Sequence, residues 1–187
     1  HRVLIDNFIA SHSSAPTELT LDLDATDDAV HGRQEGRFFH GYYDQYCFLP
    51  LYVFCGDELL TSYLRPANID GAKHAAAIVK LITQRLRQAW PKVAITIRAD
   101  SGFCRRRLLG WCERNDVRYV IGLAKNRRLA ALAAAPIRDI EAAFACTGEK
   151  QRGFAEFRYA AGTWSTDRRV ILRAEHGPQG SNPRYVV

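Results

Sequence analysis

Two aspartates follow predicted strands at positions where carboxylates could hold a metal ion. Asp24 ends the stretch Glu18–Asp24, in which three leucines alternate with polar residues as in a strand with one buried face. Asp100 follows the β-branched stretch Val93–Ala99 and precedes a predicted helix. If these strands are neighbours, the two carboxylates meet and repel each other unless a cation neutralises them. We therefore expect Asp24 and Asp100 to bind metal together.

The chemistry that such a pair supports is two-metal phosphodiester cleavage, with metal ions about 3.5–4 Å apart on the attacking and leaving oxygens. Asp22 lies on the same strand face as Asp24, about 7 Å away, and is a rival for the first metal position. Asp27 and Asp28 are further options, although a solvated acidic loop explains them more simply. Asp100 or Ser101 could instead cap the helix, and Asp24 could be an ordinary loop carboxylate.

Other kinds of active site find little support in the sequence. His31 and His40 are nine residues apart, which matches no zinc template. GxSxG, Walker A and GxGxxG sequences are absent. The five cysteines are odd in number and lack CxxC spacing, so we expect reduced thiols; they are Cys47, Cys55, Cys104, Cys112 and Cys146.

Basic residues cluster after Asp100 and after a later predicted strand. Residues 98–128 hold nine Lys/Arg against three Asp/Glu, a net charge of +6, whereas residues 1–70 hold four against eleven, a net charge of −7. A solvated basic face is one explanation, but clustering beside strand ends favours contacts with DNA phosphates. The residues predicted to make these contacts are Arg105, Arg106, Arg107, Lys125, Asn126, Arg127 and Arg128.

The elements that must position these residues follow the order β-β-β-α-β-α-β. A polar loop over 25–45 enters a strand pair at Cys47–Cys55 and Glu58–Leu64, and Pro50 argues for an edge or a bulge. Residues 71–90 have helical periodicity, and Val117–Leu123 is a further strand. An Ala-rich helix over 130–144 is predicted to break at Pro136, and short strands recur from Gly153 onward. This order predicts an α/β fold of the ribonuclease-H-like kind.

The composition fits a folded, DNA-associated protein. Of 187 residues 47% are apolar, and no apolar run is long enough for a transmembrane helix. The sequence starts at His1 and contains no Met, so we expect an internal fragment. A reducing cytoplasm fits the cysteines.

Four stretches resemble bacterial insertion-sequence transposases with a group-one DDE domain. They are DATDDAVHGRQEG (Asp24–Gly36), FLPLYVFCGDELLTSYLRPANIDGA (Phe48–Ala72), IRADSGFCR (Ile97–Arg105) and YVIGLAKN (Tyr119–Asn126). The resemblance covers most of the chain from about Leu19 to Val187.

This resemblance implies a ribonuclease-H-like mixed sheet and a D…D…E triad that binds two Mg²⁺, with Mn²⁺ as a substitute. It places the first acid on Asp24 and the second on Asp100. In the family the glutamate follows a β-rich insertion, and we expect it beyond residue 187. Glu175 is not assigned, because its flanking residues do not match. The fragment is therefore expected to be nearly inactive alone.

The resulting expectation is a transposase core that cuts and joins DNA at insertion-sequence ends. Expected partners are transposon-end and target DNA and a second subunit, in the bacterial cytoplasm at the nucleoid and not at a membrane. The expected divisions are an N-terminal helix and linker (1–17), a partial core (18–150) and a β-rich insertion (151–187). Another ribonuclease-H-like nuclease, such as a resolvase or a ribonuclease, and a non-catalytic DNA-binding or assembly module remain alternatives.

Overall fold

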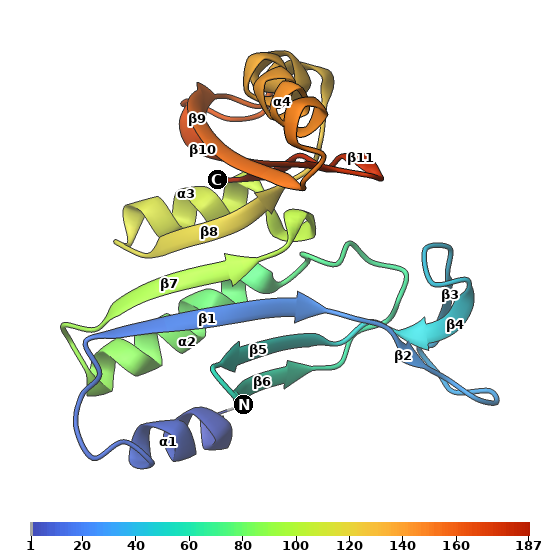
Figure 1. Cartoon of the computed structure of the whole chain (residues 1–187). Helices are drawn as coiled ribbons and strands as arrows, with labels where there is room; N and C mark the ends of the chain where they lie inside the picture. The colour runs from blue at the N-terminus through green and yellow to red at the C-terminus, as the bar shows by residue number, and fades with distance from the viewer. Residues whose placement is uncertain (1) are drawn as a thin grey trace. The chain divides into compact units, whose positions relative to one another are not determined.

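A computed structural model describes residues 2–187, which form two units that meet in the chain between Val120 and Ile121 (Figure 1). Each unit is described by itself. The elements of the first unit are α1 (Arg2–Ala10), β1 (Glu18–Ala25), β2 (Asp28–Ala29), β3 (Phe38–His40), β4 (Gln45–Phe48), β5 (Leu51–Cys55), β6 (Glu58–Tyr63), α2 (Ala75–Ala89), β7 (Ala94–Ala99), the 3₁₀ helix η1 (Ser101–Phe103) and α3 (Arg106–Arg114).

The main sheet of the first unit has the strand order β7-β1-β5-β6. β1 runs parallel to β7 and antiparallel to β5, and β5 is antiparallel to β6. The alternation in β1 arises because Leu19, Leu21 and Leu23 are buried while the residues between them are not. The predicted fold is confirmed, with three antiparallel strands followed by a strand that returns parallel to the first.

The sequence predicted one strand over the apolar run Cys47–Cys55, but the structure has two. β4 ends at Phe48 and β5 begins at Leu51, and β4 belongs to a separate small sheet with the order β2-β4-β3. Pro50 lies in the gap because it has no N–H to donate to a strand ladder. The predicted loop over 25–45 also contains β2 and β3, which are too short to show a strand period.

The helices of the first unit bury the apolar faces that their periodicity predicts. In α2 the buried residues include Val79, Ile82 and Leu86, and in α3 they include Leu108 and Leu109. Residues 71–74 precede α2 rather than belong to it, because His74 adopts a left-handed conformation with φ 71° at its N-cap.

The second unit is a sheet with one long helix on it (Figure 1). β10 lies between β9 and β12, and β12 pairs antiparallel with the end of β8. The elements are β8 (Arg118–Leu123), which begins in the first unit, α4 (Arg127–Thr147), β9 (Gln151–Tyr159), β10 (Arg168–Gly177), β11 (Gly180–Ser181) and β12 (Arg184–Val186).

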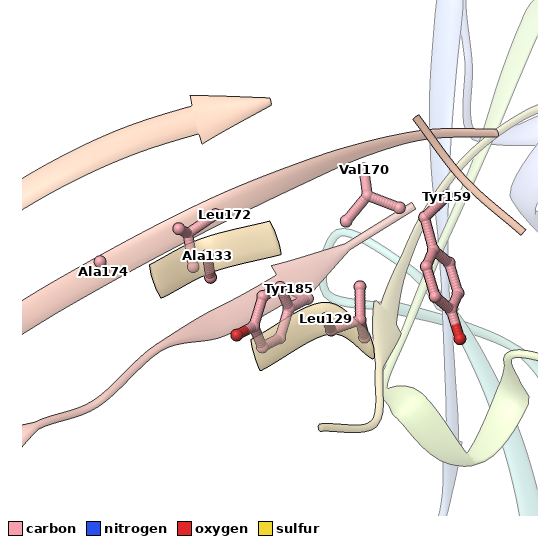
Figure 2. Packing of buried hydrophobic residues seen from close by; sticks show 7 residues of the cluster. All are labelled: Leu129, Ala133, Tyr159, Val170, Leu172, Ala174 and Tyr185. Carbon is pink, nitrogen blue, oxygen red and sulfur yellow. The ribbon is translucent and has the colours of Figure 1, made fainter. Parts of the chain in front are cut away.

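The core of the second unit lies between α4 and one face of this sheet. Figure 2 shows the helix and strand residues that meet there. All seven are buried, and they come from α4, β9, β10 and β12: Leu129, Ala133, Tyr159, Val170, Leu172, Ala174 and Tyr185. The sequence supplies this core through alternation along β10 from Arg168 to Ala174 and through the small Ala133 on the helix.

Helix α4 differs from its sequence prediction in its length and in the unit to which it belongs. The predicted break at Pro136 is wrong, because α4 continues through the proline. The predicted division at residue 150 differs from the observed units, because α4 packs on β9 and β10 and groups with the strands that follow it. The roles of core and insertion stay predictions. Among residues 2–187 no helix has the length and apolarity that a membrane crossing requires.

Candidate active site

Asp24 and Asp100 follow directly on the last paired residues of two neighbouring parallel strands. The β1–β7 ladder ends with Leu23 opposite Ala99; Asp24 is the next residue of β1, and Asp100 is the residue directly after β7. Adjacent strands lie about 4.8 Å apart, and residues in register project to the same face. Both side chains are exposed. The parallel pairing thus brings the two predicted acids to the same edge of the sheet.

The Asp100 carboxylate is in part a helix cap, as one alternative suggested. It is the N-cap of η1, and its Oδ1 accepts a hydrogen bond of 2.8 Å from the Gly102 amide. A Cβ at position 102 would lie 2.9 Å from that Oδ1, so the turn favours glycine. No hydrogen bond to Oδ2 occurs within residues 2–187. Capping therefore orients the carboxylate and leaves one oxygen available.

The Asp24 carboxylate has no hydrogen bond or ion pair with any residue that the structure describes. Beside it in the chain, the Ala25 carbonyl accepts a long hydrogen bond of 3.5 Å from the Tyr43 hydroxyl. Burial raises the pKa of the Tyr43 hydroxyl, and the negative charges of Asp27 and Asp24 add to this effect. Asp24 is thus an uncompensated anion at the strand end.

Asp22 is in a different situation because a cation already binds it. It lies opposite Arg98 in the β1–β7 register, and Arg98 Nη2 donates to Asp22 Oδ2 at 2.6 Å while Nε donates to Oδ1. This hydrogen bond raises the pKa of the Arg98 guanidinium. Both oxygens of Asp22 are occupied by a fork-shaped donor, which is a strong arrangement for a carboxylate.

No group of three or more His, Cys, Asp or Glu side chains is placed to share a metal ion in the part of the chain that the structure describes. The carboxyl oxygens of Asp24 and Asp100 are nevertheless of the type that Mg²⁺ prefers. All five cysteines are free thiols. Burial raises the pKa of the Cys112 thiol to about 12, which makes it an unreactive core residue.

The predicted DNA-binding residues of the first unit lie at the start of α3. Arg105, Arg106 and Arg107 are all exposed. Arg105 is engaged by Asp70, with 2.7 Å between Nη2 and Oδ2. Burial alone would raise the pKa of Asp70, but hydrogen bonds from Arg105 and the Ala72 amide, with the charge of Arg105, lower it.

The remaining predicted residues lie at the start of α4 in the second unit. Asn126 is the N-cap of α4 and accepts a hydrogen bond of 3.0 Å from the Leu129 amide. Arg128 donates to the Ala160 carbonyl at 3.0 Å and lies over the Tyr159 ring. Lys125 and Arg127 are exposed. Asn126 and Arg128 therefore also hold the unit together.

Residue patterns missed a pocket in the first unit. Its volume is about 410 Å³, and it lies between the segment before α2 and the start of α3. Its polar residues are Asp70, Lys73, His74, Arg105 and Arg107. One local signal for this pocket was present in the sequence. Asp70 precedes a glycine, and this order favours a turn in which the Asp carboxylate accepts a hydrogen bond from a backbone amide two residues later. That bond forms, with 2.7 Å from the Ala72 amide to Asp70 Oδ1.

Glu175, the late acid left unassigned, is buried among cations. Arg152 Nε lies 2.7 Å from Oε1, and Lys150 and Arg173 lie 3.8 Å away. The hydrogen bond from Arg152 holds the pKa of Glu175 below its ordinary value. This environment stabilises a carboxylate without any metal ion.

Comparisons with known proteins identify the family of the chain. The family model described as "Transposase DDE domain group 1" matches residues 1–187. Among solved structures, a cryo-EM structure of the piggyBac transposase synaptic complex with hairpin DNA is similar, with a TM-score of 0.51 at 15% identity. The match covers 99% of this chain and 36% of that one. No curated protein matches the chain.

The structural likeness bears on the fold, and the family match covers the stretches that contain Asp24 and Asp100. The chain therefore belongs to the group 1 DDE-domain transposases.

Proposed function

We propose that Asp24 and Asp100 are the first two carboxylates of the catalytic site and that they hold Mg²⁺, or Mn²⁺ in its place, for DNA strand cleavage and strand transfer at the ends of an insertion sequence. The observation that carries this proposal is the parallel β1–β7 pairing, which ends one residue before each acid. Two carboxylates at adjacent strand ends repel each other, and a divalent cation between them removes that cost.

The same geometry supports Asp24 rather than Asp22 as the first ligand. Arg98 neutralises Asp22 and occupies both of its oxygens. A metal ion at Asp22 would have to displace this guanidinium, whereas Asp24 has no partner to lose among the described residues. The pair of Asp22 and Arg98 then acts as a positioning pair that fixes β1 against β7 on the face shared with Asp24.

In this site the chain's own residues orient the metal ligands and the DNA. The bound cations would supply Lewis acidity for the attacking and leaving oxygens of a phosphodiester. Gly102 fixes the Asp100 carboxylate through its amide, which engages Oδ1 and leaves Oδ2 for a metal ion. The exposed basic residues at the start of α3 and of α4, from Arg105 to Arg107 and from Lys125 to Arg128, would hold phosphates.

The partners that follow are transposon-end and target DNA, with a second copy of the chain when the ends are paired. A bacterial setting at the nucleoid is part of the same proposal. The support for DNA as a partner is chemical, because residues 121–187 hold 11 Lys/Arg against 6 Asp/Glu. Such an excess of positive charge favours a polyanion.

Mn²⁺ binding to the 187-residue chain tests the site directly, measured by electron paramagnetic resonance of the free ion. Asp24→Asn and Asp100→Asn should each weaken binding more than about tenfold, the lower limit seen when even an outer partner of a metal ligand is lost. The matched control is the double variant Asp22→Asn/Arg98→Gln, which removes an acid from the same face together with its cation.

Binding by this control should remain close to that of the wild type. A loss equal to that of Asp24→Asn would instead assign the ligand to Asp22. If the wild-type chain binds no Mn²⁺, or if neither Asp24→Asn nor Asp100→Asn changes binding, the proposed site is wrong.

A further inference from the structure

The sheet of the second unit has one face under α4 and a second face that is open. Strand alternation and register define this second face, here called the outer face, which comprises Arg152, Phe154, Glu156 and Arg158 of β9, Arg169, Ile171, Arg173 and Glu175 of β10, and Arg184 and Val186 of β12. The residues between them point to the core with α4. The face is therefore a continuous surface across three strands.

The outer face carries a net positive charge. It holds five arginines against two glutamates, a net charge of +3, within a unit whose own net charge is +5 from 11 basic and 6 acidic residues. The planar guanidinium of arginine matches the geometry of a phosphate and is favoured where phosphates are bound. The charge thus fits a polyanion.

Phe154 is one of three apolar residues on the outer face, with Ile171 and Val186, and it is the only exposed one of the three. It is 68% exposed, although a buried aromatic side chain would gain about 1.5–3 kcal/mol relative to an exposed one. Phe157 and Tyr159 of the same strand pack in the core, so the strand does not lack inward aromatic positions. An exposed aromatic ring beside an arginine is an arrangement on which nucleic-acid bases stack.

Phe154 belongs to a row that crosses the sheet. It lies directly opposite Arg173 of β10, which lies opposite Arg184 of β12. With strands about 4.8 Å apart, this row spans about 10 Å, which is longer than one nucleotide step of an extended strand. A ring at one end and two guanidiniums beyond it therefore match one base and its neighbouring phosphates.

The arginines of this row differ from the others in what they bind. Arg169 pairs with Glu156 at 2.8 Å and Arg158 with Asp167 at 2.8 Å, so their charges are compensated. Arg184 has no ion-pair partner within residues 2–187. Arg173 reaches Glu175 only at 3.8 Å, and its Nε is buried without a hydrogen-bond partner in the described chain. Arg184 therefore carries the least compensated charge of this row, and Arg173 lies between it and Phe154.

We propose that the outer face binds single-stranded DNA, with a base stacked on Phe154 and phosphates on Arg173 and Arg184. Single strands fit better than duplex because a duplex hides the base faces that an exposed ring can contact. The inference rests on the proposed function for DNA as the substrate, but it concerns a surface that needs no metal ion.

Fluorescence anisotropy with a labelled 12-nucleotide oligo-dT, in EDTA, tests the proposal on the 187-residue chain. Phe154→Ala should weaken binding at least about fivefold, the loss expected for one stacked base. Phe154→Trp should retain or improve binding, since it keeps a stacking ring. Arg184→Gln should also weaken binding, whereas Arg138→Gln, at an exposed position of α4 on the other side of the sheet, is the matched control and should change it little.

Three results would overturn the proposal. The Phe154→Ala variant could bind oligo-dT as tightly as the wild type. It could also lose affinity for duplex and for single-stranded DNA to the same extent. Sedimentation could instead show that Phe154→Ala breaks a dimer of the wild type, which would make this face an interface between copies. Arg184→Gln serves as the second variant if Phe154→Ala does not fold.

The two proposals can fail separately. Asp24→Asn and Asp100→Asn should leave binding of oligo-dT in EDTA unchanged, because the outer face holds no metal ligand. A chain that binds oligo-dT through Phe154 but binds no Mn²⁺ would refute the metal site and leave the outer face intact.

Discussion

Arg65 is the most deeply buried charged residue of the first unit, with 1% of its surface exposed. Its guanidinium donates to the backbone carbonyls of Leu49, Gly71 and Lys73 at 2.7–2.9 Å. Burial lowers the pKa of Arg65, although the negative charge of Asp70 opposes this effect. One side chain thus satisfies carbonyls on both sides of the hairpin and fixes the segment that leads into α2.

Replacement of Arg65 by Met should therefore lower the free energy of unfolding by about 3 kcal/mol or more, because several buried carbonyls lose their donors. Urea denaturation measures this change. The control is Arg87→Met, since Arg87 also donates to two carbonyls, those of Asn115 and Asp116, but at the surface. It should cost no more than about 1 kcal/mol. Equal losses would contradict the role of burial.

Glu175 should make the stability of the second unit depend on pH. Its pKa in the folded chain is lowered from the ordinary value of 4.5, first by the hydrogen bond from Arg152 and further by the charges of Arg173 and Lys150. A lowered carboxyl pKa stabilises the fold fully above the unfolded value, and the effect is lost as the pH falls through the folded value.

Urea midpoints of the wild type and Glu175→Gln should consequently differ at pH 7 and converge as the pH falls below 4.5. Glu149→Gln, at an exposed position before β9, should follow the wild type throughout. A constant difference between the wild type and Glu175→Gln down to pH 3 would show that charge is not the cause.

At the scale of elements, sequence periods predicted the long strands and helices but not where prolines interrupt them. β1, α2 and β7 follow from alternation or helical spacing alone. Pro50 separates β4 from β5, whereas Pro136 is accommodated inside α4. The difference lies in tertiary packing, since Leu129 and Ala133 anchor α4 just before its proline.

The sequence predicted the residues of the candidate site but not which of them lie side by side or bind each other. The positions of Asp24 and Asp100 at strand ends follow from local pattern, and their adjacency needed the parallel β1–β7 register. The partnership of Asp22 with Arg98 depends on the same register, across 76 residues of sequence, and no local signal carries it. Asp70 was missed because its partner, Arg105, comes from a distant helix.

Pro136 offers a test of how packing overrides propensity. Pro136→Ala restores an N–H that can donate to the Leu132 carbonyl and removes a clash in the helix interior. We expect the free energy of unfolding to rise by about 1–2 kcal/mol, after allowance for the greater freedom of the unfolded chain. Thermal melts followed by circular dichroism measure it. Ala135→Gly, one residue earlier in α4, should instead destabilise by about 1 kcal/mol.

At the scale of the whole molecule, the net positive charge is unevenly divided between the units. Residues 121–187 hold 11 basic and 6 acidic residues and thus contribute +5 of the total net charge of +6. The first unit, which contains Asp24 and Asp100, is close to neutral. Such a division separates the proposed metal-binding function from most of the electrostatic affinity for DNA.

The dependence of duplex affinity on salt can show whether both units contact one DNA molecule. Arg107, in the first unit, and Arg127, in the second, are exposed and have no ion pair within residues 2–187. If each neutralises one phosphate, Arg107→Gln and Arg127→Gln should each reduce the slope of log affinity against log salt concentration by about 0.9.

The double variant should then reduce the slope by about 1.8, because counterion release from separate phosphates is additive. Titrations of a labelled 20-base-pair duplex between 50 and 200 mM salt give the slope. Arg85→Gln is the control, since Asp6 already binds Arg85 at 2.7 Å, and it should leave the slope unchanged. If one single variant matched the wild type and the double variant matched the other single variant, only one of these arginines would contact the duplex, and the other would lose its assignment as a phosphate ligand.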